Sequence, residues 1–267
     1  MANAASKRIA DLKPGDGYVQ SFARGLEVIR SFSADAPSQT LTEVAERSGL
    51  TRAGARRILL TLQALGYVVA DGKLFSLTPR ILDLGFAYLS SMPMWNLAEP
   101  VMEALVATVK ESCSIAALEG TDIVYVMRIP THKIMSISLG VGSRLPAYCT
   151  SLGRVLLAAL PEAELPERLE AADITSRTRY TVTDMKELTA RIAQVRKQGW
   201  SLVNQELEEG LVSMSAPLTN RAGQVVAGLN ISGQANRTSA KTMQETMLPP
   251  LLSAAKEISR MLAVQRA

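Results

Sequence analysis

The sequence has little histidine and cysteine, and this scarcity excludes several kinds of site. A single histidine, His132, argues against a zinc site of Cys and His ligands and removes most routes to histidine-based acid–base catalysis. The two cysteines, Cys113 and Cys149, form no CxxC pair, which argues against a disulfide framework and favours a reducing cytoplasm. We therefore expect neither a metal nor a cofactor.

Long hydrophobic runs are also missing. The longest segments without a charged residue, 84–98 and 222–236, span 15 residues each and are interrupted by polar residues, Pro or Gly. A membrane-spanning helix needs about 20 mostly apolar residues, so we expect no membrane span. Residues 1–17, MANAASKRIADLKPGDG, lack the apolar core of a secretory signal and are expected to form a flexible tail.

The charge of the chain is placed unevenly. The 267 residues carry a net charge of +4, and their composition, 47% apolar and 20% charged, is that of a globular protein of about two domains. Residues 1–80 hold 11 Lys and Arg against 7 Asp and Glu, whereas residues 81–267 hold 18 of each. The positive excess is thus N-terminal, where it suits a polyanion. A solvated helix face is the alternative reading of the same charges.

Hydrophobic spacing predicts three helices in the N-terminal part. The first spans about 21–33, and the second is a short helix from Leu41 that stops at Gly49. Thr51 is a suitable N-cap for a third helix that runs to about residue 65. Apolar side chains of the third helix recur at the i, i+3, i+4, i+7 spacing of a core face, at Ala55, Ile58, Leu59, Leu62 and Leu65.

The other face of the third helix is basic, and a hairpin follows it. A helix, a tight Gly-containing turn and a second helix with basic residues in its first turns form a helix-turn-helix arrangement. Asp71-Gly72 between two apolar runs signals a β-hairpin. The sequence therefore predicts a winged helix over residues 18–78.

This arrangement predicts how DNA would be contacted. We expect Arg52 and Arg56 to reach base edges in the major groove, since arginine matches guanine through its two-pronged donor geometry. Arg57 is expected to bind phosphate, and the small Ala53 permits close approach to the groove. Thr42, Thr51 and Lys73 are expected to fix the register on the phosphate backbone. A solvated turn lysine is the equal alternative for Lys73.

These residues resemble a known family. The run LTEVAERSGLTRAGARRILLTLQALGYVVADGKLFSLTPRILDLG, residues 41–85, resembles the winged-helix domain of the IclR family of bacterial transcriptional regulators. Its segment TRAGARRILLTL is similar to the branch that controls aromatic catabolism through the β-ketoadipate pathway. A looser resemblance covers residues 145–160, 199–218 and 225–233. The resemblance implies a homodimer or homotetramer that binds double-stranded operator DNA and senses a small organic acid through its C-terminal domain.

The remainder of the chain predicts a linker and a second domain. Residues 79–94 read as a linker helix that is apolar nearly all round, which either a second subunit or the same chain must cover. From residue 95 to 267, strand-like segments alternate with helices, which suggests a mostly antiparallel sheet with helices on its faces, resembling the GAF fold. The expected fold class is α+β: a winged helix-turn-helix, a linker helix and a GAF-like α/β effector-binding domain.

The resemblance also implies an effector site, placed at the helix start after LPAYCT and on two late strands. Backbone N–H groups at a helix start attract carboxylates, which agrees with this placement. Arg144 is suited to neutralise a dicarboxylate, or else is a surface residue. The implied effector is a small aromatic acid or a ring-cleavage dicarboxylate, and the positions that match the family site are Ser151, Leu152, Leu211, Ser213, Asn230 and Ser232.

Other classes of function have weaker support. Cys149 invites a nucleophile reading, but no histidine accompanies it, and a small buried apolar residue is the better interpretation. An enzyme that uses the winged helix for protein contacts, or a non-catalytic oligomerising sensor, remains the alternative. The sequence favours a ligand-responsive, DNA-binding regulator of the cytoplasm that is not an enzyme.

Overall fold

The computed structural model describes residues 17–91, 94–131 and 139–264, and its chain divides into two compact units, Met1–Ser90 and Ser91–Ala267. Each unit is described by itself. The predicted tail, Pro93 and His132 lie outside the described residues, apart from Gly17 at the end of the tail. Within the described part, no helix is both long and apolar enough to cross a membrane.

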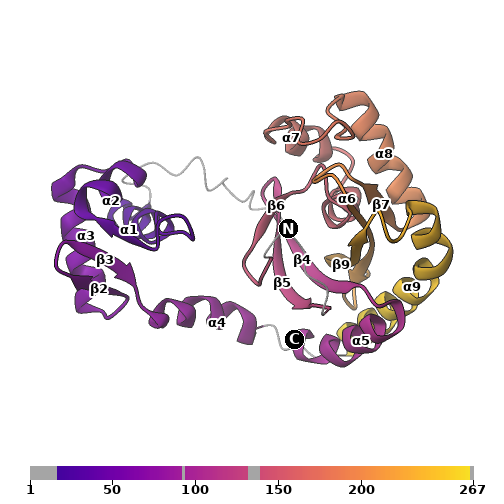
Figure 1. The fold of residues 1–267 in the computed structure, drawn as a ribbon, viewed down its shortest axis with the longest axis horizontal. Coiled ribbons are helices and arrows are strands. Elements are labelled where there is room, and N and C mark those ends of the chain that lie inside the picture. Colours follow the sequence, from indigo (N-terminus) through magenta and orange to yellow (C-terminus); the bar gives the residue numbers. More distant parts are fainter. Residues whose placement is uncertain (1–16, 92–93, 132–138, 265–267) are drawn as a thin grey trace, which may run out of the picture. The chain divides into compact units, whose positions relative to one another are not determined.

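Three helices and a small sheet form the first unit (Figure 1). The helices are α1 (Gln20–Arg30), α2 (Leu41–Arg47) and α3 (Arg52–Ala64). Strands β1 (Ser38–Thr40), β2 (Val68–Asp71) and β3 (Leu74–Leu77) pair antiparallel in the order β1-β3-β2. This confirms the predicted winged helix-turn-helix.

Local chemistry sets the ends of these elements. The Thr40 side chain accepts from the backbone N–H of Glu43, whose carboxylate accepts from the Thr40 N–H, a reciprocal cap that starts α2. Thr51 caps α3 as expected, since its hydroxyl accepts a hydrogen bond of 3.1 Å from the N–H of Gly54. Gly72 lies in the left-handed region, φ 57°, which the turn between β2 and β3 requires.

The core of the first unit is only partly the predicted one. Ala55, Leu59 and Leu62 of α3 are buried as expected, and Val28 of α1 joins them. Leu65, predicted to face the core, is 53% exposed. The i, i+3, i+4, i+7 spacing therefore predicted the buried residues in the middle of α3 but not the exposure of Leu65, which lies at the end of the helix. On α1 the apolar Phe22 is likewise exposed.

A linker helix follows the wing. Pro79 starts the 3-10 turn η2 (Pro79–Ile81), and α4 (Leu82–Ser91) continues from it. Leu82 and Phe86 are each 69% exposed, and Leu84 and Tyr88 are also exposed. The residues of the first unit therefore leave most of this apolar helix uncovered.

A six-stranded antiparallel sheet forms the centre of the second unit (Figure 1), in the order β6-β5-β4-β9-β8-β7. Its strands in chain order are β4 (Ser112–Glu119), β5 (Asp122–Ile129), β6 (Arg144–Pro146), β7 (Ser201–Asn204), β8 (Leu211–Thr219) and β9 (Val225–Gln234). The sequence pattern also predicts a strand over residues 134–146. Residues 134–138 lie outside the described residues, residues 139–143 are not a strand, and only Arg144–Pro146 form a strand, β6.

Helices cover both faces of this sheet. Helices α5 (Met94–Val109) and α9 (Ala240–Val264) pack on each other and on β4, β5 and β8, whereas α6 (Ser151–Ala158) packs on β4, β7, β8 and β9. Two further helices, α7 (Leu165–Glu170) and α8 (Met185–Gln198), lie on the side of α6, as Figure 1 shows. The predicted α/β architecture with helices on both faces is confirmed.

Three elements were missed or misplaced from the sequence. Strand β1 lies in residues 36–40, which the sequence pattern predicts as a loop, and the six-residue α7 was not predicted. The sequence pattern predicts a final helix over residues 250–264, whereas α9 begins ten residues earlier, at Ala240, and contains Pro249 and Pro250. The earlier start has a local cause, since the Ser239 hydroxyl accepts from the N–H of Thr242 and so caps the first turn.

The two faces of the sheet differ in polarity. The face toward α5 and α9 is apolar, with residues such as Cys113, Ile115, Met214, Leu229 and Ile231 fully buried. The face toward α6 carries buried polar side chains on the three central strands: Ser112, Ser114, Ser213, Ser215, Asn230 and Ser232. One face thus serves as the core, and the other concentrates hydrogen-bonding groups beneath a helix.

The first turn of α6 lies against the loop before it. A Cβ on Gly153 would stand 2.1 Å from the carbonyl oxygen of Ala147. Because that oxygen belongs to the backbone, a side chain at this position would have to displace the loop. Gly153 therefore sets the distance between the loop and α6.

We expect Gly153→Ala to destabilise the second unit by about 3 kcal/mol, the upper end of typical overpacking costs, because the backbone must shift. Thermal unfolding followed by circular dichroism measures the effect. Gly140→Ala is the control, since a Cβ there meets no atom within 4 Å. Equal melting temperatures for the two variants would contradict the close packing.

Candidate nucleic-acid interface and ligand cavity

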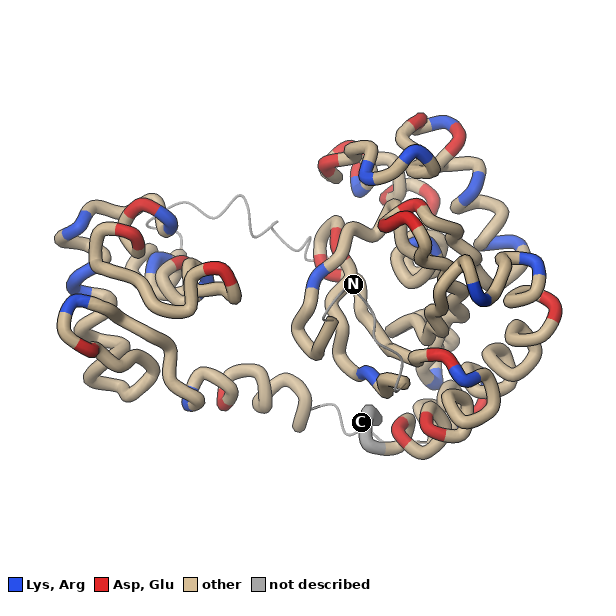
Figure 2. Tube along the Cα trace, in the orientation of Figure 1, with Lys and Arg blue, Asp and Glu red and all other residues tan. Residues whose placement is uncertain are grey.

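The outer face of α3 presents arginines to solvent. Arg52, Arg56 and Arg57 are exposed, and α3 contains no acidic residue, so its trace in Figure 2 carries blue segments and no red ones. Among the described residues, none of these three side chains makes an ion pair. The guanidinium groups are therefore available to an external anion.

The other predicted DNA contacts lie around this helix. Ala53 is exposed in the first turn of α3, Thr42 in the first turn of α2, and Lys73 in the turn between β2 and β3. Thr51 accepts a hydrogen bond as the cap of α3, which leaves its hydroxyl proton free to donate. All seven predicted residues thus lie at the surface of one small domain.

An apolar groove runs between α1 and α3. Its lining includes Phe22, Leu26, Ile58 and Leu65, and Leu84 of α4 also contributes. Phe22 is 68% exposed, which is unusual for a large apolar side chain on a folded domain. Of the apolar residues at helical spacing on α1, Phe22 and Leu26 line this open groove, whereas Ile29 also packs against the core.

A cavity lies between α6 and the polar face of the sheet in the second unit. Six of the seven predicted effector residues line it: Ser151, Leu152, Leu211, Ser213, Asn230 and Ser232. The space open to the centre of a water molecule is about 20 Å³, enough for about one water. An organic acid therefore requires the cavity to widen.

The polar groups of the cavity are incompletely satisfied. Ser151 Oγ and Ser215 Oγ are 2.6 Å apart, and Asn230 Nδ2 donates to Ser232 Oγ at 2.9 Å. Asn230 is 3% exposed, yet its Oδ1 has no hydrogen-bond partner. Thr150 caps α6 through the N–H of Gly153, while the N–H groups of Ser151 and Leu152 precede the first intrahelical acceptor.

Arg144, the seventh predicted residue, does not line the cavity. It lies exposed on β6, where Nε is 3.2 Å from Asp122 Oδ2 and Nη2 donates to the Glu119 carbonyl. The surface reading of Arg144 therefore fits the structure, because a nearby carboxylate already pairs with it. The arginine that lines the cavity is Arg128 of β5, which was not predicted.

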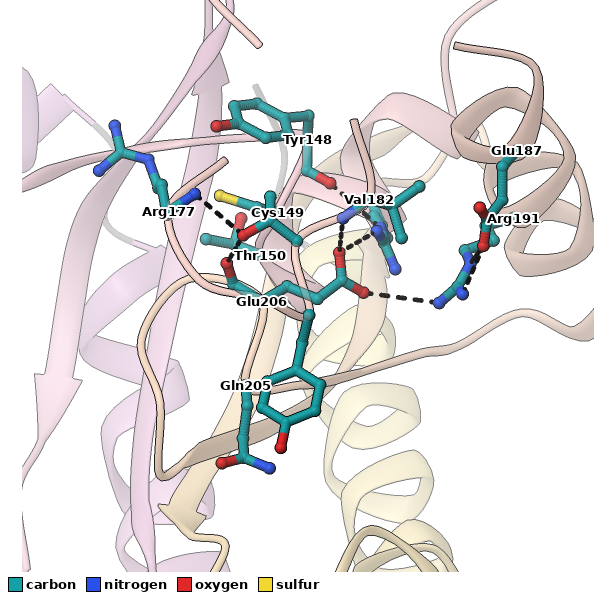
Figure 3. Close-up of polar contacts among 12 residues, drawn as sticks. Tyr148, Cys149, Thr150, Arg177, Val182, Glu187, Arg191, Gln205 and Glu206 are labelled. Atoms are coloured by element: carbon teal, nitrogen blue, oxygen red, sulfur yellow. Dashed lines mark hydrogen bonds and ion pairs between the residues drawn. The ribbon is translucent and has the colours of Figure 1, made fainter. Parts of the chain in front are cut away.

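A buried ion pair holds the walls of the cavity together (Figure 3). Arg154 Nη2 is 2.5 Å from Glu206 Oε2, with both side chains at most 4% exposed, and Arg154 Nε donates to the Tyr148 carbonyl. Glu206 also accepts from the N–H of Val182 at 3.3 Å and lies 3.6 Å from Arg191. The pair thus joins α6, the loop before it, the segment before β8, and α8.

Cys149 lies in the same region, but its environment does not suit a nucleophile. Burial raises the pKa of the Cys149 thiol to about 11, and burial also raises the pKa of Cys113. The thiol of Cys149 is therefore protonated at neutral pH, whereas the thiolate is the reactive form. In the described part of the chain, no group of three His, Cys, Asp or Glu residues is placed to hold a metal.

Family models match both units of the chain. The model for the IclR helix-turn-helix domain matches residues 21–72, and the model for the C-terminal part of the bacterial transcriptional regulator IclR matches residues 86–260. The second match alone covers more than half of the sequence.

Individual proteins are similar over most of the chain. The Pca regulon regulatory protein of Pseudomonas putida is 42% identical over 258 residues, which are 96% of this chain and 89% of that protein. The crystal structure of a transcriptional regulator from Rhodococcus sp. RHA1 matches this chain with 48% sequence identity and a TM-score of 0.81. The match covers 92% of this chain and 98% of that one.

A second similar structure contains a ligand. It is a double mutant of the inducer-binding domain of the PobR transcription factor from Acinetobacter, in complex with 3-hydroxybenzoic acid. That domain is 29% identical, with a TM-score of 0.58, and the match covers 62% of this chain and 97% of that one.

We expect Glu206→Gln to lower the unfolding free energy by about 3 kcal/mol, because it leaves the buried Arg154 without a counter-charge. Urea denaturation followed by circular dichroism measures the loss. Glu187→Gln removes an exposed carboxylate paired with Arg191 and should cost less than about 1 kcal/mol. Similar losses in both variants would show that the buried pair contributes no more than a surface one.

Proposed function

This chain belongs to the IclR family of bacterial transcriptional regulators, and we propose that it binds operator DNA through α3 under the control of an organic acid bound between α6 and the sheet. The observation that carries the proposal is the arginine face of α3, exposed and free of ion pairs among the described residues. An unpaired basic helix on a winged-helix scaffold suits the major groove of DNA.

The proposed contacts divide into two kinds. Arg52 and Arg56 lie four residues apart on one face of α3 and are assigned to base edges. Arg57 is assigned to phosphate, since it also lines the groove beside α1 and so lies toward the flank of the helix. Contacts to the phosphate backbone are also assigned to Thr42, Thr51 and Lys73. Ala53 is assigned no contact of its own, but its small side chain lets α3 approach the groove closely.

A second copy of the chain is the proposed cover of the apolar linker helix. Leu82 and Phe86 are each 69% exposed, and the groove between α1 and α3 continues to Leu84. An apolar surface of this kind is typical of a protein–protein interface. A homodimer would present two α3 helices to DNA half-sites about 34 Å apart, or a multiple of that distance.

The proposed effector is a small aromatic acid or a ring-cleavage dicarboxylate, and the proposed target genes serve the catabolism of aromatic compounds. A Pca regulon regulatory protein is the relative that is 42% identical, and a double mutant of the similar PobR inducer-binding domain is in complex with 3-hydroxybenzoic acid. The cavity supports this class, because it combines apolar walls with a few polar groups. We further propose that the protein acts in the cytoplasm without catalysis of its own, since its relatives are transcriptional regulators.

We expect the double substitution Arg52→Ala with Arg56→Ala to abolish retardation of an operator duplex selected from a random-sequence library with the unaltered protein. The physical reason is the loss of two base contacts, each worth about 1–3 kcal/mol of discrimination. Arg221→Ala with Arg237→Ala removes the same charge from exposed positions of the second unit and should leave binding unchanged. Retained retardation by the α3 variant would show that another element contacts the DNA.

We expect Phe86→Asp to convert the dimer to a monomer, because it places a charge in the centre of the proposed apolar contact. Sedimentation velocity at micromolar concentration distinguishes one 28.8 kDa chain from two. Phe86→Leu keeps the surface apolar and should remain dimeric. If Phe86→Asp sediments like the unaltered protein, α4 is not the contact.

A further inference from the structure

A β-bulge decides where the side chain of Arg128 points. Strand β5 pairs with β4 so that Ile115 faces Met127 while the next residue, Ala116, faces Tyr125. Val126 is therefore an extra residue without a partner on β4. Because of this insertion, Tyr125 and Arg128 lie on the same face of the sheet although they are three residues apart. Both line the cavity.

The bulge brings a positive charge into the cavity without a counter-charge. Arg128 is the one charged side chain among the described residues that line it. Its Nη1 donates to Ser114 Oγ at 3.2 Å, but no carboxylate of the described part of the chain lies within ion-pair distance. Within the described residues this half-buried cation is satisfied by one hydroxyl, which is costly, and an anionic ligand would offset this cost.

The cation is the first member of a polar row that crosses the sheet. Strand register places Arg128 beside Ser114, Ser114 beside Asn230, and Asn230 beside Ser215, all on the face toward α6. Arg128 and Asn230 are thus two strand spacings apart, about 10 Å between backbones. The unpartnered Asn230 Oδ1 marks a second point in the same cavity that needs a polar contact.

We propose that Arg128 anchors the carboxylate of the effector and that Asn230 holds a second polar group farther along the molecule. Through Arg128, the cavity would then bind acids more tightly than their neutral analogues. Through Asn230, it would favour acids that carry a hydroxyl, keto or second carboxyl group at the far end of the molecule. This inference rests on the proposed function, in that it takes the cavity as the effector site.

The test compares acids with matched neutral compounds. Binding to the full-length protein is measured by isothermal titration calorimetry with 4-hydroxybenzoate, protocatechuate, muconate and β-ketoadipate. The amides 4-hydroxybenzamide and protocatechuamide are the neutral analogues of the two aromatic acids. Arg128→Gln is the test variant, and Arg128→Lys restores the charge without the two-pronged geometry. Arg144→Gln is the matched control, because Arg144 lies outside the cavity and pairs with Asp122.

We expect Arg128→Gln to weaken the tightest-binding acid by about 10- to 100-fold, the usual range for a lost charge-assisted hydrogen bond. Arg128→Lys should recover part of this loss, Arg144→Gln should behave like the unaltered protein, and amide affinity should not fall. A purely structural role for Arg128 would instead lower the affinities of acid and amide together. The ratio of the two affinities therefore separates anchoring from a folding defect.

Two outcomes would overturn the inference, and they differ in what else they overturn. Equal acid affinity in Arg128→Gln and the unaltered protein would refute the anchor while leaving the effector class intact. If the unaltered protein binds none of the four acids, the proposed effector class fails together with the anchor. Thermal unfolding followed by circular dichroism, measured in parallel for every variant, checks that the second unit, which holds Arg128, is folded.

Discussion

The buried ion pair of Arg154 and Glu206 joins the segments that shape the ligand cavity. One partner belongs to α6, whose first residues line the cavity, and the other precedes β8, which supplies Leu211 and Ser213. Each charge also has a backbone partner, the Tyr148 carbonyl and the Val182 N–H. Separating the two side chains would leave a buried charge without its partner, which costs several kcal/mol. The pair therefore resists movement of the segments that carry it. The cavity walls are therefore fixed relative to one another at this end.

The opposite end of the cavity is less constrained, and this difference indicates how a ligand could act. The cavity has room for about one water, so an effector must move something to enter. Among the described residues, Arg128 has one hydroxyl as its hydrogen-bond partner, and Asn230 Oδ1 has none. The end beside α6, by contrast, is fixed by the ion pair and by the packing of Gly153. Widening is therefore expected on the side of β5 and Leu139. A ligand shifts the protein only through its different affinity for the narrow and wide forms.

Features that depend on local chemistry could be predicted from the sequence, and features that depend on distant chain segments could not. Thr51 caps α3 and Gly72 takes the turn between the wing strands, because both roles are decided within a few residues. The direction of Arg128 depends on how β5 pairs with β4, and strict alternation from the inward Tyr125 would have placed Arg128 on the opposite face. Leu65 and Phe22 are likewise apolar but exposed, because they line a surface groove and not the core. Hydrophobic spacing alone does not distinguish these two environments.

The positive charges of the two units differ in their exposure to solvent, and this difference would let DNA and a small acid bind at different sites. The arginines of α3 are exposed, so their attraction to phosphate is long-ranged and weakens as salt screens it. Arg128 is partly buried in an otherwise uncharged cavity, where a charge interaction is screened much less. At physiological salt, where exposed charges are screened, a small acid would therefore bind weakly to the arginines of α3 and more strongly to Arg128. A small acid bound at Arg128 could thus regulate DNA binding without competing with DNA for α3. The reason is that phosphate meets α3 in solvent, whereas the acid meets Arg128 in a partly buried cavity.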